Sequence, residues 1–301
     1  MLLAPVRAFP GMRRLLFTVI VACASLAAPR AQDRISLDEV VTRASAAAVR
    51  FGTALQGIVA RERYLQTVRP WKGSAPEGPA EAQPLETRTL LSSLLLVHDP
   101  DTPWQLHRDV VAVDDVPVAD REDRLTALFA SPGADPKRRL REITEESARH
   151  NLGHVTRNIN VPTFPLLIVH PAYRERFRFS DRGRMREDGV DVRLVAFREK
   201  GRPRVVRGDR LRDVELRGLL AIDEASGELV RAVITPRAGD LRSLLRVSFA
   251  HVAELPVRVP VRLWEWYWVH DVPERDRYVE GEASYDDFRR YTTDVGVPVV
   301  K

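Results

Sequence analysis

The most unusual chemistry-bearing stretch of the sequence is Trp264-Glu265-Trp266-Tyr267-Trp268. On a strand, successive side chains point to opposite faces, so Trp264, Trp266 and Trp268 would share one face, and Glu265 and Tyr267 the other. Both faces would carry apolar area, which predicts a strand that is covered on both sides. The tryptophans then either fill a core or line an apolar cavity, and the sequence leaves both interpretations open.

Two histidines, His150 and His154, stand four positions apart, the spacing that places two metal ligands on one helical face. A zinc-protease motif needs a glutamate directly after the first histidine, but Asn151 stands there, and Gly153 argues against a continuous helix. The sequence also has no glycine-x-serine-x-glycine nucleophile motif and no glycine-rich phosphate-binding loop after a predicted strand. The sequence therefore predicts no catalytic, cofactor-binding or metal site.

The first 31 residues contain four arginines and no acidic residue, and an apolar stretch, 15–26, follows Arg13-Arg14. The stretch is too short to cross a membrane as a helix and has the length of a signal-peptide core. We expect residues 1–31 to be a signal peptide and the protein to be exported, either periplasmic or secreted. Cys23 follows Ile20-Val21-Ala22 as in a relaxed lipobox, so it is either discarded with the leader or kept as a lipid anchor.

The basic character of the chain comes from this leader. Without it, 43 basic residues stand against 42 acidic ones, a net charge of +1. A nearly neutral protein has no general electrostatic attraction to nucleic acid, and a single cysteine cannot form an internal disulfide. Two short basic clusters, 137–139 and the alternating Arg174, Arg176 and Arg178, are either solvated surface or contacts to the head groups of an envelope membrane.

The elements that would position these residues form a single domain, 32–301. Ser36, with Glu39 three positions later, predicts a helix start, and the apolar stripe of that helix runs to Val59. The helix is expected to end near Tyr64, where alternation over 64–68 predicts a strand. A loop is expected at 70–84, then strands at 87–98 and 104–113, and a helical insertion at about 121–152 made of helices at 121–130 and 136–150. Further strands, predicted to form one large antiparallel sheet, are expected at 177–179, 190–197, 218–222, 229–234, 244–255, 257–269 and 278–285, with a turn at 180–189.

From Val190 onward the sequence resembles the periplasmic lipoprotein-carrier superfamily, which includes outer-membrane lipoprotein-sorting proteins. The resemblance rests on VDVRLVAFREKG, GLLAIDEASGELVRAVI, LPVRVPVRLWEWYWV and VEGEASYDDFRRY, within about the last 110 residues. It implies a strongly curved antiparallel β half-barrel that is partly closed by helices. Together with the predicted N-terminal helix and helical pair as the covering, this gives an expected α+β fold. It also implies an apolar cavity that holds acyl chains. The N-terminal helix and the helical insertion make this chain longer than the simple carriers.

We therefore expect a non-enzymatic cell-envelope protein that binds a lipid or another apolar small molecule in the half-barrel cavity, without a cofactor. The sequence does not determine the oligomeric state. Two alternatives stay open: a secreted hydrolase whose active-site residues meet only in space, and an envelope scaffold protein without a ligand. The residues expected to line the cavity or the core are Trp264, Trp266, Trp268, Leu245, Val247 and Phe249.

Overall fold

A computed structural model of the chain describes residues 35–79, 83–99, 102–118, 124, 136–153, 160–207, 213–239, 241–253, 255–269 and 276–290. All of these belong to the structural unit Ile35–Lys301. Several features expected from the sequence lie outside the described residues, namely the signal peptide 1–31 with Cys23, the helix 121–130 apart from Arg124, and His154.

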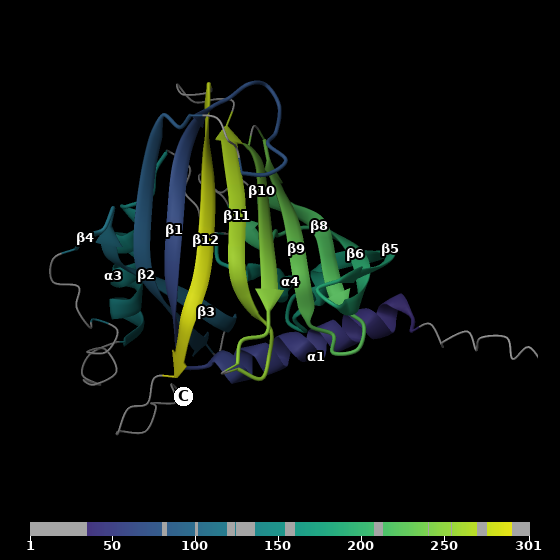
Figure 1. Ribbon diagram of the computed structural model, residues 1–301. Helices are drawn as coiled ribbons and strands as arrows, with labels where there is room; N and C mark the ends of the chain where they lie inside the picture. The colour runs from purple at the N-terminus through teal and green to yellow at the C-terminus, as the bar shows by residue number, and fades with distance from the viewer. Residues whose placement is uncertain are drawn as a thin grey trace, which may run out of the picture. The chain divides into compact units, whose positions relative to one another are not determined.

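One antiparallel sheet dominates this unit, with the strand order β4-β3-β2-β1-β12-β11-β10-β9-β8-β6-β5 (Figure 1). The short strand β7 pairs with β8 off this path. The sheet is open and curved, which confirms the predicted α+β class and half-barrel. Its strands are β1 (Ile58–Pro70), β2 (Glu86–Asp99), β3 (Thr102–Val113), β4 (Val116–Pro117), β5 (Phe177–Glu187), β6 (Val190–Glu199), β7 (Val206–Arg207), β8 (Asp213–Asp223), β9 (Leu229–Ala238), β10 (Leu241–Ala250), β11 (Val259–Val269) and β12 (Arg277–Arg290).

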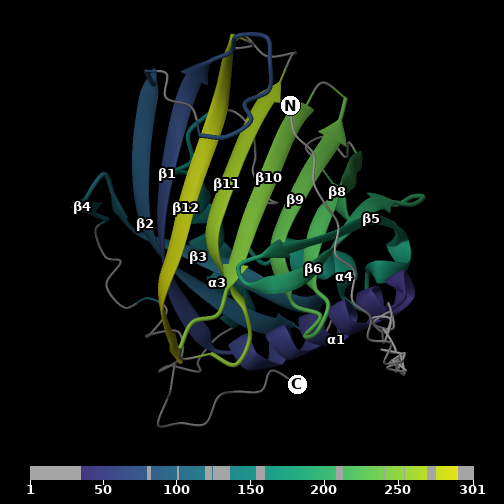
Figure 2. The same cartoon turned by 45° about the vertical axis from the view of Figure 1, so that its right-hand side comes forward.

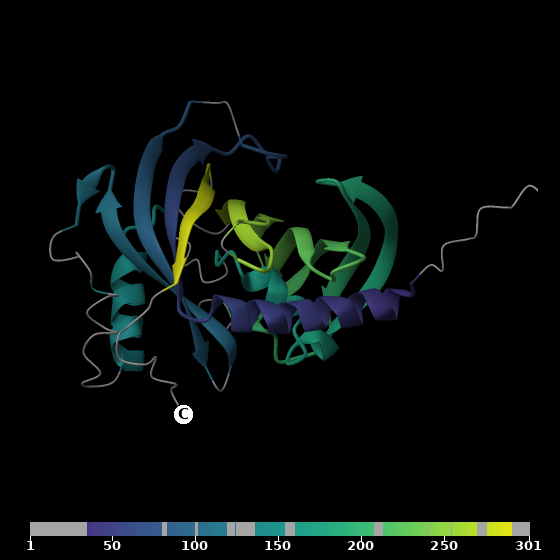
Figure 3. The ribbon, with the colours of Figure 1, turned by 60° about the horizontal axis from the view of Figure 1, so that its bottom comes forward.

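Three α-helices are described, α1 (Leu37–Leu55), α3 (Pro136–Ala148) and α4 (Phe164–Val169), with a 3-10 turn η1 (Arg174–Arg176). Helix α1 runs across one end of the strands (Figures 2 and 3) and contacts α4 and β3. Helix α3 packs along β3, and α4 contacts β9. No described helix has the length and apolar character needed to span a membrane.

Helix α1 begins where the sequence predicts but ends earlier. The Ser36 hydroxyl accepts a hydrogen bond from the Glu39 amide at 3.1 Å, which satisfies one of the free N–H groups of the first turn. The helix stops at Leu55 because Gly57 adopts a left-handed conformation, with φ +71°. The extension of the helical stripe to Val59 and of the helix to near Tyr64 is therefore wrong, and both residues lie in β1.

The two faces of the sheet have different coverings. The helix-covered face packs against α1 and α4 and holds the main apolar core, which includes Tyr64, Val247 and Leu263. The opposite face is called the tryptophan face here, because Trp264, Trp266 and Trp268 pack there with Tyr278 and Trp71. Both faces of β11 are buried, as its alternating sequence predicts.

Two segments differ from the expected structure. The predicted turn 180–189 is far shorter, because β5 continues to Glu187 and the reversal is made by Asp188 and Gly189 alone. Both residues have positive φ, 49° and 79°, as a two-residue hairpin turn requires. The apolar segment 164–169, which the sequence left without an assignment, forms α4 with Pro165 in its first turn, where proline costs no hydrogen bond.

Candidate ligand-binding pocket

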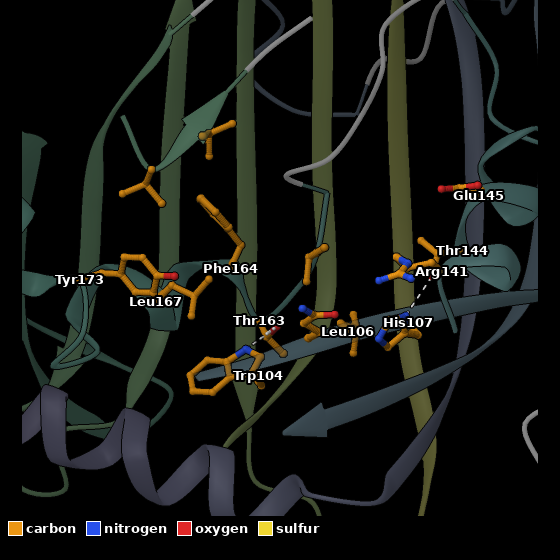
Figure 4. Close-up of a pocket in the computed structure, with 14 residues that line it drawn as sticks. Trp104, Leu106, His107, Arg141, Thr144, Glu145, Thr163, Phe164, Leu167 and Tyr173 are labelled. Carbon is orange, nitrogen blue, oxygen red and sulfur yellow. Dashed lines mark hydrogen bonds between the residues drawn. The ribbon is translucent and has the colours of Figure 1, made fainter. Parts of the chain in front are cut away.

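A pocket of about 510 Å³ lies between β3, α3, α4 and the residues Val205 and Val206 beside β8 (Figure 4). Its volume falls within the roughly 300–1,000 Å³ of typical small-molecule sites. The elements around it are distant in sequence, so the pocket forms only when α3 and α4 return to the strand β3.

One side of the pocket is apolar. In α4, Phe164 and Leu167 both line the pocket, Phe164 buried and Leu167 partly buried, whereas Ile168 is buried in the core. The apolar residues of the lining are Leu106, Val161, Phe164, Leu167, Tyr173, Val205 and Val206. This side offers continuous apolar surface to a ligand.

Trp104 of β3 is held in place at the base of this apolar side. Its Nε1–H donates to Thr163 Oγ1 at 3.2 Å, and its ring lies 5.6 Å from the Phe51 ring and 5.5 Å, edge-on, from the His170 ring. A Cβ atom at Gly52 would lie 3.0 Å from the indole, so glycine lets α1 approach Trp104 closely. The indole is thus a rigid part of the pocket.

The other side of the pocket is polar and comes from β3 and α3. Thr144 Oγ1 donates to the Leu140 carbonyl at 2.9 Å, so the same oxygen accepts from Nδ1–H of His107, 3.1 Å away. Burial lowers the pKa of His107 below its usual value, which favours the neutral ring and leaves Nε2 as an acceptor. Arg141 and Glu145 also line this side and are exposed, so it opens to solvent.

A separate group of buried polar side chains lies on the helix-covered face. Arg108 donates to both oxygens of Glu62, at 2.6 and 2.8 Å, and its guanidinium lies 5.5 Å from the Tyr64 ring centre. Burial alone would lower the pKa of Arg108, but the Glu62 carboxylate more than offsets this and raises it. Glu265 accepts hydrogen bonds from the hydroxyls of Tyr64 and Tyr267. Each buried carboxylate is thus stabilised by hydrogen bonds.

Tyr285 of β12 lies in the same group. Its hydroxyl is buried and has no hydrogen-bond partner within the described part of the chain. Burial, together with the nearby Glu62 carboxylate, raises the pKa of Tyr285 well above its usual value, so the phenol stays protonated. Neither carboxylate of this group lines the pocket, and we assign the group to the stability of the sheet.

The six residues expected to line a cavity or core are divided between the two faces. In the β10–β11 register Leu245 is opposite Glu265, and Trp264 is opposite Arg246. Opposite residues share a face and successive residues alternate, so the structure places three on the helix-covered face and three on the tryptophan face: Leu245, Val247 and Phe249; Trp264, Trp266 and Trp268. All six are buried, and none lines the pocket. The structure does not bring the two sets together.

The tryptophan face is covered by the chain that follows β1. Trp71 stacks on Trp268 with ring centres 4.6 Å apart and lies 6.1 Å from the Trp266 ring. Trp264 Nε1–H donates to Glu280 at 2.7 Å, and Arg69 pairs with the same carboxylate at 2.5 Å. These tryptophans pack together with Tyr278 and Trp71 in a second buried layer.

No motif in the sequence indicates the pocket itself. Trp104 stands at the start of a predicted strand, and His107 belongs to no recognisable pattern. The apolar segment 164–169, bracketed by prolines, was the one local signal for the α4 wall. No spacing in the sequence shows that α3 and α4 meet β3, since their contacts are tertiary.

No family model matches the chain, and no curated protein matches it in sequence. Among solved structures, it is similar to an outer membrane lipoprotein-sorting protein domain from Vibrio parahaemolyticus, with a TM-score of 0.39, 12% identity, and coverage of 81% of this chain and 91% of that chain. It is also similar to a DUF1329 family protein from Desulfovibrio piger (TM-score 0.35, 10% identity, 85% and 94%) and a LolA superfamily protein from Nitrosomonas europaea (TM-score 0.33, 9% identity, 86% and 95%).

Proposed function

We propose that this protein is a non-enzymatic cell-envelope protein that binds a lipid, or another largely apolar small molecule, in the pocket between β3, α3 and α4. The observation that carries the proposal is the division of the pocket into an apolar and a polar side. An acyl chain against Leu167 and Phe164 would gain about 0.8 kcal/mol for each buried methylene. Arg141 and the free acceptor of His107 would lie near a polar head group.

The geometry favours binding over hydrolysis. A hydrolase would need carboxylates or a nucleophile and base in contact with a substrate pocket. The one carboxylate that the described lining contributes, Glu145, is exposed to solvent. Two of the buried carboxylates, Glu62 and Glu265, are held outside the pocket by Arg108 and by tyrosine hydroxyls. In the pocket, His107 is bonded through Nδ1 to Thr144, an alcohol that donates its own proton to a backbone carbonyl.

The assignment to the cell envelope rests on the leader. We propose that residues 1–31 are a signal peptide and that 32–301 is one domain. Intact-mass analysis of the exported protein tests this. A mass that begins after residue 31 supports a discarded leader, and a mass with an acylated Cys23 as the first residue supports a lipid anchor instead. Protein that keeps an unmodified leader would contradict export.

The ligand proposal is tested by extraction and by displacement. Protein purified from its native host is extracted with organic solvent and analysed by mass spectrometry, and binding of a fluorescent fatty acid is titrated in parallel. We expect a co-purifying lipid and saturable binding. Leu167→Arg should weaken that binding at least tenfold, since it places a charge against the acyl chain.

Leu85→Arg is the matched control, because Leu85 is 54% exposed directly before β2 and does not line the pocket. It should bind the probe like the unmodified protein. Absence of both lipid and probe binding would overturn the proposal and favour a scaffold protein without a ligand. Equal losses in the two variants would show that the probe binds somewhere else.

A further inference from the structure

Three arginines stand side by side on the tryptophan face, near the edge of the sheet away from β3. In the strand register Arg178 of β5 is opposite Arg198 of β6, and Arg198 is opposite Arg217 of β8. Neighbouring strands are about 4.8 Å apart, so the three Cα atoms span about 10 Å. Like charges directly opposite each other destabilise a sheet, so this arrangement carries an energetic cost.

The three arginines border a hollow of about 420 Å³. Arg182, Ser180 and Thr235 also line it, so that its polar groups are guanidinium groups and hydroxyls, all of which can donate hydrogen bonds. Ala196 and the backbone at Gly218 contribute to the lining as well. These small groups leave space between the long arginine side chains.

The positive charge of the hollow is only slightly compensated. Glu215 pairs with Arg198 at 2.7 Å. Within the described part of the chain, Arg178, Arg182 and Arg217 have no ion pair and no side-chain hydrogen bond, and no carboxylate lines the hollow. Other arginines of this face are engaged differently, since Arg242 and Arg246 lie over the Trp268 and Trp264 rings.

We propose that this hollow binds a phosphate group, held by Arg178, Arg198 and Arg217 together with the Ser180 and Thr235 hydroxyls. Guanidinium groups bind phosphate through paired, charge-assisted hydrogen bonds, and a bound dianion or monoanion would remove the repulsion among the arginines. The phosphate group belongs either to an anionic phospholipid or to a soluble phosphate compound. The site lies on the face opposite α1 and α4 and is independent of the proposed ligand pocket.

The test compares two double variants with the same change in net charge. Arg178→Gln/Arg217→Gln alters the site, and Arg63→Gln/Arg149→Gln removes two exposed arginines elsewhere. Thermal unfolding is followed with and without inorganic phosphate, and binding is measured to vesicles of phosphatidylglycerol mixed with phosphatidylcholine. If the phosphate is a lipid head group, binding to the mixed vesicles should fall about fivefold for each site arginine removed, hence about 25-fold for the pair.

Unmodified protein and the control pair should both gain thermal stability from phosphate, and the site pair should not. Without phosphate, the site pair should unfold at the same or a higher temperature than the unmodified protein, because the opposed charges are gone. Vesicle binding that depends on the site identifies a lipid head group, and phosphate stabilisation without vesicle binding identifies a soluble ligand. Phosphate and vesicle effects that are equal in the two pairs would overturn the proposal.

Discussion

Gly281 of β12 lies where the Tyr64 ring and the Glu265 side chain meet. A Cβ atom at this position would stand 2.6 Å from the Tyr64 hydroxyl oxygen and 3.0 Å from Glu265 Cγ. Gly281 does not have a positive φ, so the requirement for glycine is one of space. The buried Tyr64–Glu265 hydrogen bond therefore depends on the missing side chain of a third residue.

The substitution Gly281→Ala should lower the free energy of unfolding by about 1–3 kcal/mol, the usual cost of overpacking a buried site. Urea unfolding followed by circular dichroism measures this. Gly78→Ala is the control, because a Cβ at Gly78 meets no atom within 4 Å, and it should change stability by less than about 0.5 kcal/mol. Equal stability of the two variants would show that Tyr64 moves aside without loss.

The buried ion pair between Glu62 and Arg108 makes both residues difficult to replace. Both oxygens of Glu62 are used by one guanidinium, and the Glu62 side chain has no solvent exposure. Loss of either partner would leave the other charge buried without compensation. The pair reaches across β2 and therefore favours the observed registers of β1 and β3 on β2, since a slip of one residue would move Glu62 to the opposite face.

At the scale of the elements, the segment directly after β1 covers the tryptophan face, a role that its composition does not indicate. Trp71 contacts the rings of Trp266, Trp268 and Tyr278, at 6.1, 4.6 and 6.0 Å between centres. Its amide also donates to the Asp276 carbonyl at 2.6 Å, which ties the end of β1 to the start of β12. The segment is a cover for the tryptophan face.

We expect Trp71→Ala to expose the tryptophans beneath it. Each aromatic contact is worth about 0.5–1.5 kcal/mol, so the variant should be less stable, and acrylamide should quench its fluorescence more strongly per remaining tryptophan. Leu85→Arg, at an exposed site after the same loop, serves as the control and should keep the quenching of the unmodified protein. Unchanged quenching in Trp71→Ala would mean that other residues cover this face.

The sequence predicts elements well where one local pattern decides them. The β8–β9 hairpin, the two faces of β11 and the start of α1 at Ser36 all follow from alternation or capping. The end of α1 was misplaced because Ile58 and Val59 continue the helical spacing by chance, and only the backbone of Gly57 separates them from the helix. The pocket could not be predicted, because His107, Leu167 and Arg141 meet through tertiary packing alone.

For the whole molecule, the pH dependence of stability should reflect two histidines, the buried His107 and the partly buried His170. Burial lowers the pKa of both His107 and His170 below the usual value of about 6.5. The unfolded chain therefore binds more protons than the folded protein as the pH falls through this value, and the free energy of unfolding must decrease.

The variant His107→Gln should lose part of this dependence. We expect the difference in unfolding free energy between pH 7.5 and pH 5.5 to be smaller than in the unmodified protein, with His170 supplying a remaining share. Urea unfolding at the two pH values measures it, and His107→Gln/His170→Gln should reduce the difference further. A slope that stays the same in both variants would assign the pH dependence to carboxylates.

The pairing of β1 with β12 leaves β1 without one of its two neighbouring strands until almost the whole chain has been synthesised. Pro70 pairs with Arg277, about 200 residues later, and these two strands join the β2–β3–β4 side of the sheet to the β11–β5 side. At about 5–20 residues per second, a ribosome needs roughly 10–40 seconds to make the intervening chain. During that interval β1 has an unpaired edge beside an apolar face, a state prone to aggregation. Chaperones that hold nascent chains would therefore be expected to act on the N-terminal strands until the last strand is complete.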